Sequence, residues 1–440
     1  MKYSIVTFGC RVNQADSLAF EEELRASGAS AAPPEQADLI VVNTCSVTSS
    51  ADQGARQAIR RVARANPAAR IVVTGCYATR RPGEIRELPN VLCVVPNDDK
   101  PRLVPILRRA AADMTGPPGW AQVTTAERFG DGDGSCGAPI EPGAAGRTAF
   151  TLRVQTGCAE PCAYCIIPAT RGAPQSVPVD AVLGHVERVA AAGFREIALT
   201  GVHLGAYGRD LTPRSSLIGL LEALARESGA GRLRFRISSL EPADCTAEVL
   251  ALVAGTSCFA PHFHLPLQHA ANRVLAAMRR PYSIQQYTAL VAGIRERIPH
   301  AAIGSDVIVG FPGERDAEFE QLASYLETSP ITHVHVFPYS ERPGTAASAM
   351  SGKVPGTVIR ERARRAREVA GRLTSRFLAS QVGTVHRALT LEDGTLVVTG
   401  NYLKVRIPPG RARNEWVTVK VTEAGASIRG EIVEVISNES

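Results

Sequence analysis

Three cysteines in one short loop constrain this chain more than any other feature. Cys158, Cys162 and Cys165 follow the spacing C-x3-C-x2-C. A structural zinc site takes four protein ligands, and a cubane iron–sulfur cluster is usually held by four cysteines. Three thiols with no fourth nearby therefore predict a 4Fe-4S cluster with one iron left open for a small molecule. Half of a zinc ribbon is the alternative interpretation of this spacing.

Length and hydropathy bound the class of protein. The 440 residues are enough for two or three domains, and the 45% hydrophobic content supports sizeable cores. No apolar run approaches the ~20 residues of a membrane span, and the segment 1–6 is too short and then too polar for a signal peptide. We therefore expect a cytoplasmic protein without a membrane partner, in which clustered cysteines bind metal or act in catalysis.

Three more cysteines follow strand patterns in the first 110 residues. The β-branched runs at 5–7, 39–42 and 71–73 are typical of buried parallel strands. In open α/β sheets, ligands bind beyond the carboxyl ends of the strands, so residues far apart in sequence can meet there. A second three-thiol site is expected from the cysteine after each run: Cys10, Cys45 and Cys76.

The rest of the chain divides by pattern. A Gly/Pro-rich stretch containing Cys136 cannot build a core and is expected to be a linker. Six strand patterns then alternate with helical ones, which predicts a parallel sheet curled into an open (β/α)6 barrel. Short alternating strands near the end predict a small β-barrel. The expected strands of the large barrel are 150–155, 196–200, 233–238, 262–265, 303–309 and 333–337. The expected division of the chain is 1–112, 113–146 (linker), 147–375 and 376–440.

This order of parts resembles the methylthiotransferase family of radical S-adenosylmethionine (SAM) enzymes, over nearly the whole chain apart from the linker. The resemblance implies an α/β fold class with three components. They are an N-terminal flavodoxin-like parallel sheet domain, a central open (β/α)6 radical SAM barrel and a C-terminal small β-barrel, the TRAM domain.

Three segments indicate a branch of the family. The stretches 8–14, 236–242 and 336–340 are similar to the branch that modifies N6-threonylcarbamoyladenosine in tRNA. After Cys10 this chain has Arg-Val-Asn, where the isopentenyl-adenosine branch usually has Gln-Met-Asn and the branch that modifies a ribosomal aspartate has Pro-Lys-Asn. Both other substrates remain alternatives, and a zinc-stabilised RNA-binding protein is a remote one. The strip His269-Ala270-Ala271 departs from the family's usual Ser-Gly-Ser.

The resemblance also implies cofactors and chemistry. The later triad would hold a 4Fe-4S cluster that binds SAM, and the N-terminal triad an auxiliary 4Fe-4S cluster that carries the sulfur to be inserted. The methylthio group would go to C2 of an adenosine in the tRNA anticodon loop. An electron donor such as flavodoxin or ferredoxin is expected as a partner, while the sulfur donor is left open.

Five further positions are candidate SAM contacts. Each has a plainer interpretation, such as shielding of the cluster for the tyrosine or a turn with a helix cap for the aspartate. The histidines of the strands at 262–264 and 333–335 are interpreted as barrel packing rather than metal ligands. The candidates are Tyr164, Arg171, Ser176, Gly201 and Asp306.

Basic residues gather late in the chain. Between residues 351 and 380 there are eight basic and two acidic side chains, a surplus equal to the chain's net charge of +6. Such a helix before a small β-barrel predicts contact with a polyanion, and a solvated helix face is the alternative. The candidate RNA-binding residues are Arg364, Arg365, Arg367, Lys404, Arg406, Arg411 and Arg413.

Overall fold

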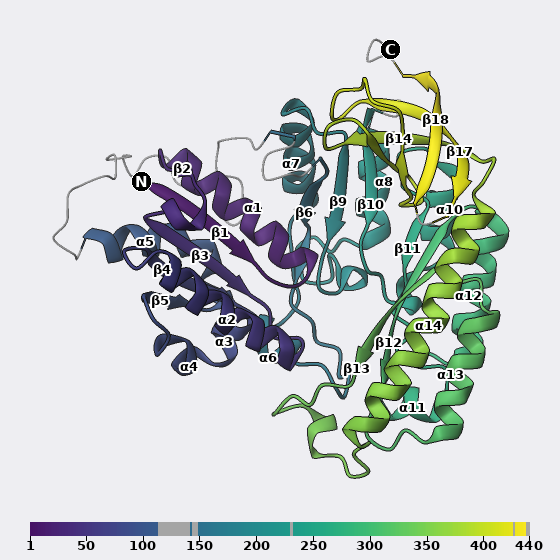
Figure 1. Cartoon of the computed structure of the whole chain (residues 1–440), viewed down its shortest axis with the longest axis horizontal. Coiled ribbons are helices and arrows are strands. Elements are labelled where there is room, and N and C mark those ends of the chain that lie inside the picture. The colour runs from purple at the N-terminus through teal and green to yellow at the C-terminus, as the bar shows by residue number, and fades with distance from the viewer. Residues whose placement is uncertain (113–140, 143–147, 229–231, 426, 437–440) are drawn as a thin grey trace.

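The computed structural model describes residues 1–112, 141–142, 148–228, 232–425 and 427–436. The expected linker and Cys136 lie almost wholly outside these ranges. Three parts follow one another along the chain, namely an N-terminal sheet with helices, a half-open barrel and a small closed barrel (Figure 1). No helix of the described residues is long and apolar enough to span a membrane.

The N-terminal part is a five-stranded parallel sheet in the order β2-β1-β3-β4-β5. This is the strand order of the flavodoxin-like doubly wound fold, as expected. Every residue of β3 is buried, which explains its continuous apolar run. The strands are β1 (Lys2–Thr7), β2 (Ser30–Ala31), β3 (Leu39–Thr44), β4 (Arg70–Gly75) and β5 (Val91–Val95). The helices are α1 (Arg11–Ala26), α2 (Ser49–Ala65), α3 (Cys76–Arg80), α4 (Pro82–Arg86) and α5 (Leu103–Ala112).

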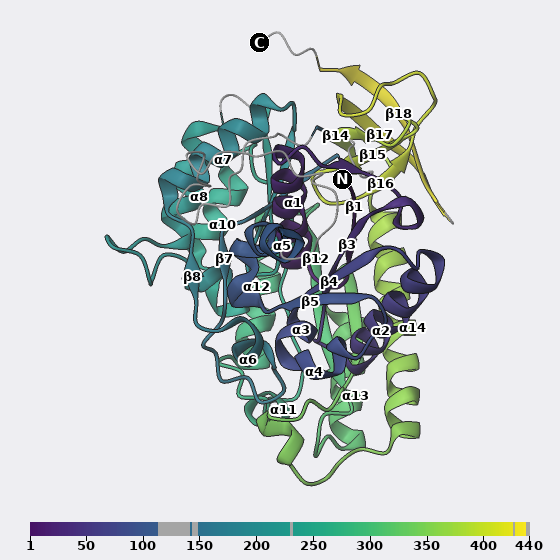
Figure 2. The ribbon, with the colours of Figure 1, turned by 90° about the vertical axis from the view of Figure 1, so that its left-hand side faces the viewer.

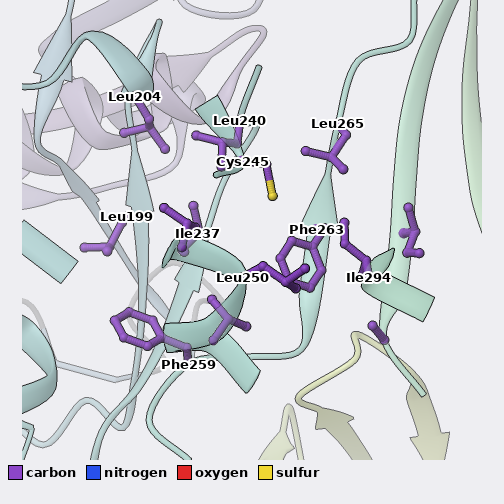
Figure 3. Packing of buried hydrophobic residues seen from close by; sticks show 14 of the residues in the cluster. Leu199, Leu204, Ile237, Leu240, Cys245, Leu250, Phe259, Phe263, Leu265 and Ile294 are labelled. Carbon is purple, nitrogen blue, oxygen red and sulfur yellow. The ribbon is translucent and has the colours of Figure 1, made fainter. Parts of the chain in front are cut away.

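The central part is the expected barrel of six parallel strands. Its strands form two three-stranded sheets, β10-β9-β6 and β11-β12-β13, joined by the single bridges Phe235↔Phe259 and Ser239↔His264. Leucine, isoleucine and phenylalanine side chains of strands and helices pack into one core (Figure 3). The strands are β6 (Phe150–Arg153), β9 (Glu196–Thr200), β10 (Arg234–Ile237), β11 (His262–His264), β12 (Ala302–Val309) and β13 (His333–Pro338). The helices are α6 (Ile167–Arg171), α7 (Val179–Ala191), α8 (Leu217–Glu227), α10 (Ala247–Gly255), α11 (Asn272–Ala277), α12 (Ile284–Arg297) and α13 (Asp316–Thr328).

The first barrel strand is shorter than expected. The pattern at 150–155 predicted one strand, but the chain leaves the sheet at Val154. The next residues form β7 (Gln155–Thr156), which pairs antiparallel with β8 (Gln175–Ser176). The three clustered cysteines lie in the loop between β7 and β8, and the pairing of these two strands joins the two ends of that loop.

A long helix joins the two barrels. Helix α14 (Gly356–Ser380) buries an alanine-rich face along β13 and α13, and it runs past residue 376, where we expected the last domain to begin. The C-terminal barrel then closes in the order β14-β15-β16-β18-β17. Its strands are β14 (Val385–Leu391), β15 (Leu396–Thr399), β16 (Lys404–Arg406), β17 (Trp416–Ala424) and β18 (Ile428–Val435).

The N-terminal sheet lies against the open side of the large barrel (Figures 1 and 2). Helix α1 packs on β6 at one free edge. At the other edge, beyond β13, Arg342 Nη1 donates to Asp52 at 2.9 Å. The open seam of the barrel is therefore covered by the part of the chain that carries the N-terminal cysteines.

Candidate functional site: two cysteine triads

The three N-terminal cysteines meet at the carboxyl edge of the first sheet. Gly9 has a φ of +91°, and a Cβ there would lie 2.5 Å from the Cys45 Cβ, so glycine is needed for the Cys10 loop to come this close. Burial, together with the neighbouring thiols of Cys10 and Cys76, raises the pKa of Cys45 to about 11. Cys45 and Cys76 are buried and Cys10 is exposed, so this triad opens on the side of Cys10.

The second triad is folded tightly by its own loop. The Cys158 amide donates to the Gly172 carbonyl at 3.1 Å, and the Cys165 amide donates to the Cys162 carbonyl at 3.1 Å. All three cysteines are half-buried. Burial raises the pKa of Cys165 to about 12, and Cys162 and Cys158 add to that rise.

Both triads suit an iron–sulfur cluster. All nine cysteines among the described residues are free thiols, and each triad is crowded enough for its members to influence one another's ionisation. A buried thiol with a raised pKa becomes a stable thiolate when a metal binds it. Soft thiolates also favour iron–sulfur clusters. Three ligands in each set leave one position of a cubane cluster without a protein thiolate.

Arg280 faces the second triad, and the sequence patterns did not reveal it. Its guanidinium donates to the Cys162 Sγ at 3.2 Å and to the Tyr164 hydroxyl at 3.4 Å. It also pairs with Glu241. Arg280 is buried, so the ion pair and the hydrogen bonds hold a fixed positive charge beside the Cys162 sulfur.

A second polar group missed in the sequence is His203, after β9. Its Nδ1 lies 3.9 Å from the Cys158 Sγ, and its Nε2 lies 2.8 Å from Asp244 Oδ2. Burial favours the neutral ring, but the hydrogen bonds with Asp244 and Cys158 outweigh it and raise the pKa of His203 to about 10. The second triad is thus flanked by two cationic donors, which favour thiolate sulfur.

Arg171 joins the two triads. It ends α6, directly after the loop of the second triad, and its guanidinium donates to Asn13 and, at 3.2 Å, to Asp16. The same guanidinium hydrogen-bonds the Cys76 side chain and interacts electrostatically with Cys76 and Cys10. The side chain that we expected at SAM therefore bonds Asn13 and Asp16 of the N-terminal part, and its Nη1 also donates to the Thr156 hydroxyl at 3.3 Å beside the cysteine loop.

Asp16 is the buried anion of this junction. Its carboxylate lies 2.6 Å from Lys100 Nζ and also pairs with Arg153 and Arg171. Burial alone would raise the pKa of Asp16, but these three cations hold it well below its usual range. Asn97 adds a further link across the junction, because its Nδ2 donates to the Thr170 carbonyl at 2.6 Å.

The other candidate SAM contacts lie in three places. Tyr164 and Gly201 are beside the second triad, where Gln155 Oε1 accepts the amides of Val202 and His203 and so fixes the loop after Gly201. Ser176 lies on β8, and its hydroxyl donates to Asp210 Oδ1 at 2.6 Å. Asp306 lies further along the barrel, on β12. Tyr164 is part of the cysteine loop itself, and Gly201 lies close to that loop through Gln155.

The histidines of the barrel are arranged around Asp306. His262 and His333 stack with ring centroids 6.0 Å apart. His264 Nε2 and His335 Nδ1 each lie 3.0 Å from Asp306 Oδ1. Ligand atoms of these last three residues lie within 4.8 Å of one another, a spacing that a metal ion accepts.

The strip at 269–271 is buried packing at the start of α11. His269 is fully buried, and its Nδ1 accepts the Ala271 amide at 3.0 Å. Burial lowers the pKa of His269 to about 4, so this ring is neutral at physiological pH. The departure from the family's usual residues therefore affects the buried packing directly before α11.

The candidate RNA-binding residues are on the surface, but several are paired. Arg364 pairs with Glu361 and Glu368 along α14, and Arg365 pairs with Glu320 of α13 at 2.7 Å. Arg367 is exposed and has no ion pair within the described chain. In the C-terminal barrel, Lys404 and Arg406 are exposed on β16, and Arg411 and Arg413 are half-exposed.

Comparison with known proteins assigns two regions to families. Residues 2–96 match the uncharacterized protein family UPF0004. Residues 152–326 match the radical SAM superfamily. These ranges contain the first and the second triad, respectively.

Whole-chain relatives extend this likeness. The threonylcarbamoyladenosine tRNA methylthiotransferase MtaB of Aquifex aeolicus is 35% identical, over 92% of this chain and 96% of its own length. The MtaB protein of Bacillus subtilis is 33% identical, over 98% and 96%. The tRNA-2-methylthio-N(6)-dimethylallyladenosine synthase of Thermobifida fusca is 34% identical, over 98% and 86%.

Among solved structures, the radical SAM methyltransferase TsrM from Kitasatospora setae has a similar fold. The TM-score is 0.55 at 15% identity, and the match covers 79% of this chain and 74% of that one. At this identity the likeness concerns the fold alone.

Proposed function

The chain belongs to the methylthiotransferase family of radical SAM enzymes, and we propose that it adds a methylthio group to C2 of N6-threonylcarbamoyladenosine next to the anticodon of tRNA. The observation that carries this proposal is the convergence of two three-thiol sites on one short segment. The Gly172 carbonyl accepts a hydrogen bond from the amide of Cys158, in the second triad. The preceding residue, Arg171, hydrogen-bonds the side chain of Cys76, in the first triad. An enzyme that forms its radical in one place and supplies sulfur from another needs both sites close to one substrate atom.

We assign Cys158, Cys162 and Cys165 to a 4Fe-4S cluster that binds SAM, and the N-terminal triad to an auxiliary 4Fe-4S cluster. When bound, the cluster on the second triad would pass one electron from the reductant to SAM and so supply radical chemistry at C2, and the auxiliary cluster would supply the sulfur. The protein's part is positioning: Arg280 and His203 offer cationic donors to the sulfurs of the second triad, and the buried Asp16 cluster fixes the distance between the triads.

The candidate SAM contacts remain a proposal. Tyr164 and Gly201 have the strongest support, because Tyr164 is in the cysteine loop and Gly201 lies close to it. Ser176 and Asp306 would contact SAM only if it reached β8 or the middle of β12. Arg171 is retained as a candidate with lower priority, since its guanidinium is occupied by Asp16 and Asn13.

We propose that exposed lysine and arginine side chains of α14 and the C-terminal barrel bind the tRNA. Phosphate contacts by arginine and lysine position RNA without reading sequence, and a splayed anticodon-loop base can then enter the site. We also retain the division 1–112, 113–146, 147–375 and 376–440, an electron donor such as flavodoxin or ferredoxin, and action in the cytoplasm.

Nucleoside analysis tests the proposed function. The reconstituted enzyme is incubated anaerobically with SAM, a reductant and tRNA that carries either threonylcarbamoyl- or isopentenyl-adenosine, and the digested tRNA is analysed by mass spectrometry. A methylthio product on the threonylcarbamoyl nucleoside supports the proposal. Product only on the isopentenyl nucleoside, or on neither, contradicts it.

A further inference from the structure

A row of rings crosses the inner face of β11, β12 and β13. Alternate residues of β12, including Val307 and Val309, pack in the hydrophobic core between the strands and the surrounding helices. Asp306 lies between them in sequence and therefore points to the inner face of the barrel. Neighbouring ring centroids lie 5.1 to 6.5 Å apart from the tyrosine at one end to the phenylalanine at the other. We call this row the ring array, and its members are Tyr402, His262, His333, His264, His335 and Phe337.

Parts of the ring array are open to solvent. The His335 side chain is 60% exposed, and Tyr402 and Phe337 are 42% and 37% exposed. Exposed rings that carry ring nitrogens and a hydroxyl offer a ligand both apolar faces and hydrogen-bonding groups.

Arg11 stands at the Tyr402 end of the array. It directly follows Cys10, the exposed thiol of the first triad. Its Nη2 donates to the Tyr402 hydroxyl at 3.3 Å, which joins the N-terminal part to the C-terminal barrel. No carboxylate of the described residues lies within ion-pair distance of this guanidinium, so Arg11 is a cation that lacks an anion.

The charges around the array are otherwise balanced or positive. Arg234 and Arg236 share the single carboxylate of Glu196, and the Arg236 guanidinium lies 4.6 Å from the centre of the Tyr402 ring. Asp306 is occupied by His264 and His335. A surplus of positive charge therefore remains at the Tyr402 end, where an anionic group would be stabilised.

We propose that Arg11 binds the carboxylate of the threonyl group of the substrate nucleoside, with the ring array as the polar wall along which that group lies. This inference rests on the proposed function. An arginine fork suits a carboxylate, with two parallel hydrogen bonds. The isopentenyl group offers neither charge nor hydrogen bonds, so it would leave Arg11 without an anion, and a site built for polar contacts rejects such an analogue strongly.

The test compares binding of three anticodon stem-loop RNAs that differ only at the target nucleoside: threonylcarbamoyl-adenosine, isopentenyl-adenosine and adenosine. The full chain with both clusters is used anaerobically, and Kd is measured by fluorescence anisotropy. Wild type should bind the threonylcarbamoyl RNA about tenfold or more tightly than the other two, since one charged contact exceeds about 1.4 kcal/mol.

Variants locate the source of this preference. Arg11→Gln should bring the Kd ratio close to one, Arg11→Lys should keep most of it, and His335→Gln should reduce it by a smaller factor. Arg226→Gln, an exposed arginine on the outer helix α8, is the matched control and should keep the wild-type ratio. Unchanged iron content in Arg11→Gln verifies that the Cys10 loop is intact.

Two results separate the two proposals. If wild type discriminates and Arg11→Gln discriminates equally well, the role of Arg11 is overturned while the proposed function stands. If wild type neither prefers nor methylthiolates the threonylcarbamoyl RNA, the proposed function itself fails.

Discussion

Arg280 donates a hydrogen bond to the Cys162 sulfur across 3.2 Å, from a position 118 residues further along the chain. Its second arm pairs with Glu241, and this ion pair together with the burial of Arg280 holds the guanidinium in place. The barrel therefore supplies a fixed positive charge to one ligand of the second triad.

Replacing Arg280 should lower the reduction potential of the cluster on the second triad. A nearby cation stabilises the more negative, reduced state. A hydrogen bond to a charged group is worth about 1.5–3 kcal/mol, which corresponds to roughly 60 mV or more for one electron. EPR-monitored titration of Arg280→Gln measures the shift, and the adjacent exposed Arg279→Gln serves as control. Equal potentials in both variants would contradict the role of Arg280.

Gly9→Ala should remove the auxiliary cluster and spare the other. The added Cβ would lie 2.5 Å from the Cys45 Cβ, on backbone with a φ of +91°. Gly28→Ala is the matched control, because Gly28 has a φ of +80° but no atom within 4 Å of an added Cβ. Iron analysis should find about half the wild-type iron in Gly9→Ala and full iron in Gly28→Ala. Full iron in both would show that the close approach of the Cys10 loop is not required.

Glu196→Gln should destabilise the contact between the two barrels in a pH-dependent manner. Glu196 pairs with Arg234 and Arg236, whose guanidinium groups also donate to carbonyls of the C-terminal barrel such as Val398 and Gly400. Burial opposes ionisation, but the two arginines outweigh it and lower the pKa of Glu196 to about 2. Removing one partner of a buried ion pair costs about 3–5 kcal/mol.

The sign of the pH effect follows from the lowered pKa. The stabilisation by Glu196 is complete above its unfolded pKa of about 4.5. It is lost as pH falls from there toward 2. Thermal unfolding of wild type and Glu196→Gln should therefore differ most at pH 6–7 and converge in acid. A difference that stays constant between pH 7 and pH 4 or grows in acid would contradict this account.

The arginines of α14 should contribute unequally to tRNA binding. Replacing Arg364, Arg365 and Arg367 with alanine should weaken binding and flatten its salt dependence, by about one unit of slope for each phosphate that the variant no longer neutralises. Arg367→Ala alone should account for a large part, because the other two are already paired with glutamates. Filter binding across a series of salt concentrations measures both quantities. An unchanged slope of the salt dependence in the triple variant would show that this face of α14 does not bind tRNA.

The sequence predicted the order of the strands and the place of the cysteines after them, since both are local signals. β9 has the expected limits, and the cysteines after β1, β3 and β4 converge because parallel strands end at one edge. The buried pairings could not be predicted in this way. Asp16 meets Lys100 and Arg171 from positions 84 and 155 residues away, and no periodicity indicates which distant charges will meet.

The basic segment of α14 shows the same limit. Arg362 is one of the eight basic residues of the segment 351–380. It is buried, however, and its Nη1 lies 2.7 Å from Glu314 Oε1. A helical pattern indicates which residues share a face, whereas the depth of that face depends on what packs against it. Arg280 and His203 were missed for a related reason, because each reaches its cysteine from a separate loop of the barrel.

The most direct test of two independent clusters is the iron and sulfide content after anaerobic reconstitution. Wild type should contain about eight irons, and replacing either Cys10, Cys45 and Cys76 or Cys158, Cys162 and Cys165 with alanine should leave about four. The chain would then carry one cluster on each triad, as the account requires. A wild type with about four irons that falls to none when the second triad is removed would contradict it.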